Sequence, residues 1–291
     1  MSIGSWADAA RQGQYHQSPE HQRAIDTIQA VLEGNLESDS AASTIASAYE
    51  PLLKRGFKSS PVATLWGMIC DVSRSLGANR EITERQIALL NSISKLPDVL
   101  DGQGKAITPA WKSAGVYWRD LPEFAMMFRE YAIGIEPLDD LDENQWDTQA
   151  EALLNATTFG AMYLVIGKQD IGMAFHAEIS LMQGIEVPCE TLEQLQRALM
   201  FVPPAATWVL IAGKRIYELC KVDHNRQDGA PGSTPIGDEW LWGKGRGYSL
   251  GRWGLWKSRF SEIATAQGLK DSVKEIAARA SSEMDRVDGQ I

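Results

Sequence analysis

A run of carboxylates in the middle of the chain has the spacing of a metal site. Between Arg129 and Lys168 there is no basic residue, and Asp139, Asp140 and Glu143 are spaced so that a helix would place them on one face. Carboxylates gathered in this way repel one another, and a hard cation such as Mg²⁺ relieves the repulsion. These three residues are the candidate metal ligands. The alternative is that they gather at a helix N-terminus, where the helix dipole stabilises acids.

A basic and aromatic segment between Trp240 and Ser261 is the second candidate. It contains no acidic residue, and cations alternate with aromatic side chains along a glycine-rich backbone. Such a backbone with cationic side chains suits a phosphate group, although the P-loop pattern is absent. Stacking of arginine on tryptophan inside the fold is the alternative. The candidate ligand-binding residues are Trp240, Trp242, Lys244, Arg246, Arg252, Trp253, Trp256 and Arg259.

Taken together, the two segments suggest the plan of a class I terpenoid cyclase. In such an enzyme a metal and nearby cations withdraw diphosphate from a prenyl substrate, and aromatic faces stabilise the carbocation. The stretch from Asp139 to Glu143 loosely resembles the aspartate-rich motif of that class. A second metal motif of the Asn/Asp-x-x-x-Ser-x-x-x-Glu kind is absent. The sequence therefore makes a magnesium-dependent lyase or cyclase a hypothesis, and it firmly implies no cofactor.

Helices are the elements that must position these residues. Ser249 is a helix N-cap, and after it Trp253, Trp256 and Phe260 recur at i, i+3 and i+7, which predicts one buried stripe. This placement puts Arg252 and Arg259 on another face.

Two further sequence patterns predict where other helices begin and end. The sequence Asp120-Leu-Pro-Glu123 predicts a capping box that starts a helix running to about residue 133. The pair Pro203-Pro204 predicts a break between a short helix capped by Thr191 and a second helix from about 205 to 221.

Helix caps and apolar residues at helical spacing occur along the whole chain and predict an all-α protein. No stretch alternates apolar and polar residues long enough to indicate a convincing strand. We expect about nine to eleven helices in a single bundle-like domain that spans residues 1–291. Residues 1–17 form an N-terminal tail in this prediction. Residues 222–249, with six glycines and two prolines, form a long loop.

The overall charge restricts the classes of partner. The chain has 291 residues and a net charge of −10. An acidic protein repels phosphate backbones and anionic lipid head groups, so we expect neither nucleic acid nor a membrane surface as partner. The two longest uncharged runs, 152–167 and 198–213, are shorter than the ~20 residues that a bilayer requires. We expect both to be buried core helices.

The cysteines and the N-terminus indicate the compartment. Cys70, Cys189 and Cys220 are widely spaced and form no Cys-x-x-Cys pair, a pattern typical of reduced thiols. The first 17 residues lack the apolar segment of a signal peptide. We expect a cytoplasmic protein.

Three blocks in the C-terminal half resemble a known family. The first is Asn-Gln-Trp at 144–146 followed by Asn-x-x-x-Phe-x-Ala at 155–161. The second is Pro-Ala-Ala-Thr-Trp at 204–208 followed by Gly-x-Arg-Ile-Tyr at 213–217. The third is Gly-Lys-Gly-x-Gly-Tyr-Ser-Leu at 243–250 followed by Arg-Trp-x-x-Trp-x-x-Arg-Phe at 252–260. Over roughly residues 110–290 the chain is similar to a filamentous-fungal family with a domain of unknown function, DUF3632. The resemblance implies a fungal source and an all-α fold, and it assigns no activity.

Two function classes follow from these patterns. The first is a small-molecule-binding protein of fungal specialised metabolism with an aromatic-lined pocket, which includes the cyclase hypothesis. The expected partner is then a small organic molecule. The alternative is a non-catalytic α-helical interaction or scaffold protein, in which the Trp240–Phe260 segment is structural or forms a partner surface. The sequence leaves homo-oligomerisation open.

Overall fold

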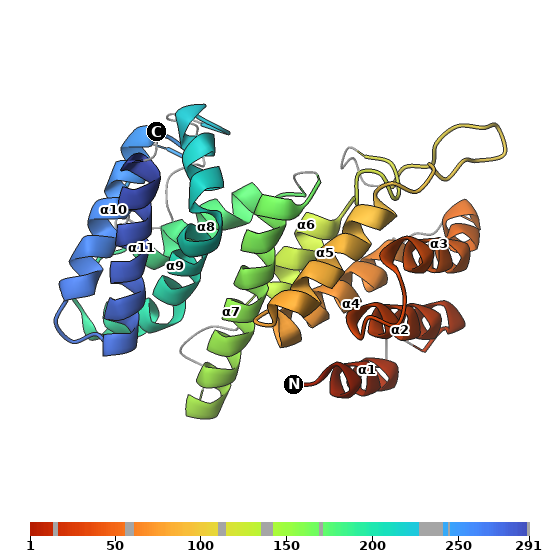
Figure 1. Cartoon of the computed structure of the whole chain (residues 1–291), viewed down its shortest axis with the longest axis horizontal. Helices are drawn as coiled ribbons and strands as arrows, with labels where there is room; N and C mark the ends of the chain where they lie inside the picture. The colour runs from red at the N-terminus through yellow and green to blue at the C-terminus, as the bar shows by residue number, and fades with distance from the viewer. Residues whose placement is uncertain are drawn as a thin grey trace. The chain divides into compact units, whose positions relative to one another are not determined.

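Figure 1 shows the computed structural model, which describes residues 1–13, 17–55, 61–109, 115–134, 142–168, 171–226, 241–243 and 245–289, apart from the side chains at 61 and 143. Within these ranges the chain forms eleven α-helices and one π-helical turn, and no β-strand. Leu100 and Ala106 form an isolated antiparallel bridge. The prediction of an all-α fold with nine to eleven helices is confirmed.

The helices belong to two compact units. Unit 1 comprises Met1–Ile135, Glu151–Phe159 and Ile166–Ile171, and unit 2 comprises Glu136–Ala150, Gly160–Val165 and Gly172–Ile291. Residues of α7 (Glu143–Ile166) are therefore divided between the two units. Asp142 caps this helix by accepting a hydrogen bond from the backbone N–H of Gln145 at 2.8 Å. The prediction of a single domain stays a prediction.

Unit 1 contains the helices of the N-terminal half. Ser18 and Asn79 cap two of them, because each side-chain oxygen accepts a backbone N–H of the first turn. Among these helices α2 packs on α3 and α5, and α4 packs on α6 and the π-helical turn. The elements are α1 (Ile3–Gln12), α2 (Pro19–Leu32), α3 (Ser38–Arg55), α4 (Pro61–Leu76), α5 (Arg80–Ile93), α6 (Phe124–Met127) and η2 (Phe128–Ala132).

The N-terminal segment is not a tail along most of its length. Residues 3–12 form α1, which Ser2 caps by accepting the backbone N–H of Ser5. The helix packs against α2 and α4, and Trp6 and Ala7 are buried. The prediction of a tail over 1–17 is therefore wrong for these ten residues. An amphipathic helix with a buried tryptophan has enough apolar surface to join the core.

The predicted capping box at Asp120 is also wrong. Asp120 instead accepts the backbone N–H of Val116 at 2.7 Å, and Glu123 adopts a left-handed backbone with φ 70°. The helix begins only at Phe124. Local side-chain hydrogen bonds of aspartate compete with helix formation in this way.

Unit 2 is built around α9. Helix α8 packs along α9, and α11 packs on both α9 and α10 (Figure 1). At Gly184 the backbones of α8 and α9 come close, since a Cβ there would lie 2.5 Å from the carbonyl oxygen of Phe201. The helices are α8 (Met173–Ile185), α9 (Leu192–Lys221), α10 (Leu250–Thr265) and α11 (Asp271–Gly289).

Helix α9 continues through its two prolines. The prediction of a break at Pro203-Pro204 is wrong, because one helix runs from Leu192 to Lys221. Thr191 and Gln194 form a capping box at its start. A proline inside a helix costs about 3 kcal/mol, and the packing of α9 against α8 and α11 offsets this cost.

By length and composition, α9 is also the one helix in the described ranges that could cross a membrane. Of its most apolar window, 61% is buried inside the structure, which is also typical of a core helix.

Candidate functional site

The structure describes only part of the two predicted sites. Asp139, Asp140, Trp240 and Lys244 lie outside the described residues, and Glu143 begins α7 with a side chain that is not described. The metal-site prediction therefore stays a prediction. Within the described ranges, no group of three His, Cys, Asp or Glu residues has the arrangement of a metal site.

Helix α10 carries the predicted aromatic stripe. Ser249 caps the helix, and its hydroxyl accepts the backbone N–H of Arg252 at 3.2 Å. Trp253, Trp256 and Phe260 are all buried, so the prediction of a buried stripe at this spacing is confirmed. The indole N–H of Trp256 donates to Glu186 Oε1 at 2.6 Å.

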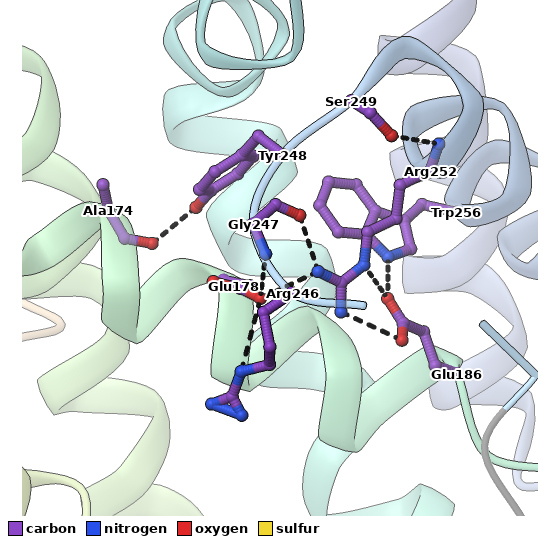
Figure 2. A network of polar contacts seen from close by, with 9 residues as sticks. All are labelled: Ala174, Glu178, Glu186, Arg246, Gly247, Tyr248, Ser249, Arg252 and Trp256. Carbon is purple, nitrogen blue, oxygen red and sulfur yellow. Dashed lines mark hydrogen bonds and ion pairs between the residues drawn. The ribbon is translucent and has the colours of Figure 1, made fainter. Parts of the chain in front are cut away.

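Arg252 does not lie on a separate face from the tryptophans. Its side chain is 1% exposed, and its guanidinium carbon lies 5.4 Å from the centroid of the Trp256 ring. Arg252 and Trp256 are one helical turn apart, and both reach the same carboxylate, Glu186 (Figure 2). The prediction is wrong for Arg252 because a guanidinium can be buried when fixed carboxylates satisfy its donors.

The guanidinium is bound on two sides. Arg252 Nε and the nitrogen NH2 donate to the two oxygens of Glu186 at 2.6 and 3.1 Å, in a bidentate arrangement. The nitrogen NH1 donates to Glu178 Oε1 at 2.8 Å and to the carbonyl oxygen of Gly247 at 2.6 Å. Figure 2 shows that these partners come from α8, from its C-terminal cap and from the segment before α10. We call Arg252, Glu178 and Glu186 the buried ionic cluster.

The charges of the cluster are balanced by a fourth residue. Glu178 and Glu186 carry two negative charges and Arg252 one positive charge, which leaves one negative charge. Arg246 Nε lies 3.8 Å from Glu178 Oε1 and supplies the second positive charge. Burial alone would lower the pKa of Arg252, but the hydrogen bonds and charges of Glu186 and Glu178 outweigh it and raise that pKa above its ordinary value.

The segment before α10 is fixed by backbone contacts. The backbone N–H of Gly247 donates to Glu178 Oε1 at 2.7 Å, and the hydroxyl of Tyr248 donates to the carbonyl oxygen of Ala174 at 2.5 Å. Gly247 has φ 87°, and a Cβ there would lie 2.3 Å from the carbonyl oxygen of Asn225. Only glycine fits this close approach without strain.

The other cations of α10 also have internal partners. Lys257 Nζ lies 2.5 Å from Asp288 Oδ2 and 3.2 Å from an oxygen of Asp285 on α11. Arg259 donates to the carbonyl oxygens at positions 185 and 187, each at 3.1 Å, and it pairs with Glu262. Both cations therefore have partners within unit 2.

Two tryptophans of the Trp240–Phe260 segment have partners outside the buried ionic cluster. The indole N–H of Trp253 donates to Asp288 Oδ1 at 2.7 Å. Trp242 is half-buried and packs 3.4 Å from where a Cβ of Gly251 would lie. The structure thus brings Arg246, Arg252 and Trp256 together around Glu178 and Glu186, and it places Trp253 and Lys257 against α11.

Sequence reasoning missed Glu178 and Glu186. A signal was present, because these are the only two acids in the otherwise apolar or uncharged stretch from Ile171 to Cys189. Acids in a buried helix require a partner. Their cationic partner lies 66 and 74 residues away in the chain.

Comparison with known proteins places this all-α chain in a family. A family model described as "Protein of unknown function (DUF3632)" matches residues 66–260, more than half of the chain. The chain therefore belongs to that family, and the whole buried ionic cluster lies within the matched region. No curated protein matches the chain, and no solved structure matches it.

Proposed function

We propose that the chain is a non-catalytic α-helical interaction protein, which serves as a cytoplasmic scaffold for a partner protein. One observation carries the proposal: the described cations of the Trp240–Phe260 segment are held by carboxylates and carbonyl groups of the same unit. Arg252 uses four of its five N–H donors in these contacts, and its side chain is 1% exposed, so a diphosphate cannot reach it. This arrangement supports a structural role for the segment over ligand binding.

Exposed apolar residues around the start of α10 support a partner surface. Val222, Leu241 and Leu250 are exposed by 71%, 43% and 50%. The backbone N–H of Tyr248 donates to the carbonyl oxygen of His224 at 2.9 Å, so the segment after α9 lies beside the start of α10. Apolar side chains gathered on a surface are typical of protein interfaces. The partner in this proposal has an apolar surface of its own.

Cross-linking tests the partner surface. A photoreactive amino acid at Leu250 should give a discrete cross-linked species with one other protein in the cells that produce this chain. The matched control is Leu192, which is 82% exposed at the opposite end of α9, about 45 Å along that helix. Equal cross-linking from both positions, or none from Leu250, would contradict the proposal.

A second experiment separates this proposal from the cyclase hypothesis. The purified protein is incubated with Mg²⁺ and farnesyl or geranylgeranyl diphosphate, and released diphosphate is measured. We expect no release, and no rise in melting temperature with Mg²⁺ beyond that given by NaCl at equal ionic strength. Protein-dependent release that the Asp140→Asn variant lacks would establish the metal site at Asp139, Asp140 and Glu143 and overturn the proposal.

A further inference from the structure

Among the described residues, Arg246 is the least tightly held cation of the Trp240–Phe260 segment. Its Nε lies 3.8 Å from Glu178 Oε1, which is longer than a hydrogen bond. That oxygen already accepts hydrogen bonds from Arg252 and from the backbone N–H of Gly247. The Arg246 side chain is 30% exposed, and in Figure 2 it points away from Arg252. Arg252 thus bridges two carboxylates inside the unit, whereas Arg246 meets one carboxylate and is accessible to solvent.

The guanidinium of Arg246 also lies over an exposed aromatic ring. Its central carbon is 5.8 Å from the centroid of the Phe175 ring, and Phe175, in the first turn of α8, is 43% exposed. Phe175 and Glu178 are three residues apart on α8 and therefore lie on one face of that helix. Contact with a carboxylate and an aromatic ring restricts the arginine while solvent still reaches it. An arginine held in this way is suited to a second carboxylate, because its planar fork matches the two oxygens.

This pair adjoins the partner surface at the start of α10. Arg246 precedes the exposed Leu250 by four residues, so their Cα atoms are at most ~14 Å apart. The segment between them is fixed, because the hydroxyl of Tyr248 donates to the carbonyl oxygen of Ala174, the residue before Phe175. A single partner can therefore reach the cation, the ring and the leucine. Arginine and aromatic side chains are enriched among the residues that carry most of the binding energy at interfaces.

We propose that Arg246 and Phe175 bind an aspartate or glutamate side chain of the partner protein that is flanked by apolar residues. The NH1 and NH2 groups of Arg246 donate to this carboxylate, and Nε still faces Glu178. The apolar neighbours pack on Phe175 and Leu250. The chain carries a net charge of −10, so a local cation fixes where an acidic side chain can sit. This inference rests on the interaction function proposed above and specifies the chemistry of its partner.

Cross-linking from Leu250 in matched variants tests the assignment. Wild type and each variant carry the photoreactive amino acid at Leu250, and the yield of the cross-linked species is compared at equal protein concentration. Arg246→Gln should lower this yield at least fivefold, because the partner carboxylate loses its cation. Phe175→Ser should lower it at least twofold. Arg246→Lys keeps the positive charge near Glu178 but cannot form a bidentate pair, so its yield should fall between those of wild type and Arg246→Gln.

A control variant and a stability measurement separate contact with the partner from folding. Arg279→Gln should leave the yield unchanged, because Arg279 is exposed on α11 and lies two residues from Ser281, which hydrogen-bonds Ser261. Ser261 is ~16 Å along α10 from Leu250. The melting temperature of each free variant is measured alongside. If Arg246→Gln does not fold, the yield from Arg246→Lys decides.

The partner residue completes the test. Mass spectrometry of the cross-linked species identifies the partner segment, and replacing its acid by the amide should lower the yield as Arg246→Gln does. The two changes together should lower it no further than either alone. Unchanged yield in folded Arg246→Gln or Arg246→Lys, or a partner segment without aspartate or glutamate, would overturn the assignment and leave the interaction function standing. No cross-link from Leu250 in wild type would contradict both.

Discussion

The buried ionic cluster of unit 2 and the turn at 118–123 of unit 1 differ in the hydrogen bonding of their buried polar groups. In the cluster, Arg252 makes hydrogen bonds with two carboxylates and a backbone carbonyl, and the indole of Trp256 also finds an acceptor. In the turn, Trp118 Nε1 and Glu123 Oε2 have no hydrogen-bond partner among the described residues. Both regions are rich in aromatic side chains, so composition alone does not distinguish them.

The two regions differ in how far their buried polar groups are hydrogen-bonded. Fully satisfied polar groups fix one conformation and leave no donor or acceptor for another molecule. Buried polar groups without a partner reduce stability by their desolvation cost. The described cations of the Trp240–Phe260 segment have partners within unit 2, whereas two polar atoms of the turn around Trp118 have none among the described residues.

The largest expected effect is the loss of the buried guanidinium. Arg252→Met should lower the free energy of unfolding by about 3–5 kcal/mol, because it leaves Glu178 and Glu186 buried without their cation. Urea denaturation measures the change. The control is Arg259→Met on the same helix, whose arginine binds carbonyl oxygens and Glu262, and which should lose less than half as much.

A compensating variant sharpens this result. Replacing both acids by glutamine in the Arg252→Met background should restore much of the lost stability, since no unpaired charge then stays buried. Additive losses in this triple variant would mean that the three side chains are not energetically coupled, which would contradict the cluster.

The next largest effect concerns the backbone that the cluster fixes. Gly247→Ala should destabilise unit 2 by about 2–3 kcal/mol, because alanine is strained at φ 87° and its Cβ meets the backbone of Asn225. Gly254→Ala is the matched control on α10, where a Cβ meets nothing within 4 Å. That change should stabilise the protein by about 0.5–1 kcal/mol. Similar melting temperatures for the two variants would refute the close approach at Gly247.

Sequence patterns predicted helix α10 but not the partners of its buried arginine. Local signals were sufficient for α10: Ser249 as cap and the spacing of Trp253, Trp256 and Phe260 predicted both the helix and its buried stripe. The partners of Arg252 were not predictable in this way. Helical periodicity describes one element at a time, whereas Glu178 and Glu186 are brought to the arginine by tertiary packing.

Two local predictions failed for different reasons. The prolines at 203 and 204 should end a helix by intrinsic preference, but packing of α9 against two other helices overrides that preference. At Glu123 the capping pattern matched, but Asp120 bonds backward to Val116 and Glu123 takes a left-handed conformation. The unpartnered atoms of the turn have no sequence signature at all.

A pair of tryptophan variants tests the comparison at single hydrogen bonds. Trp256→Phe should cost about 1–3 kcal/mol, because it removes a donor from the buried Glu186 carboxylate along with part of the ring. Trp118→Phe removes a similar area but no hydrogen bond, so its cost should be smaller by at least ~1 kcal/mol. Equal costs, measured by urea denaturation at one pH, would show that the two indoles do not differ in hydrogen bonding.

The smallest expected effect is the pH response of the turn in unit 1. The backbone N–H of Val116, and then Arg119, lower the pKa of Asp120 below its ordinary value. A carboxyl group with a lowered pKa in the folded state stabilises the protein above its unfolded pKa, and this contribution is lost as pH falls through the folded value. Between pH 7 and about pH 4 the stability difference between wild type and Asp120→Asn should therefore be constant, and below about pH 4 it should shrink.

Asparagine can still accept the N–H of Val116, and the carboxylate is partly exposed, so the difference is modest even at neutral pH. Urea denaturation of both proteins from pH 7 to pH 2.5 measures it. A difference that persists unchanged at the lowest pH would mean that the charge of Asp120 does not hold the turn, and that the conformation of Trp118 and Glu123 depends on packing alone.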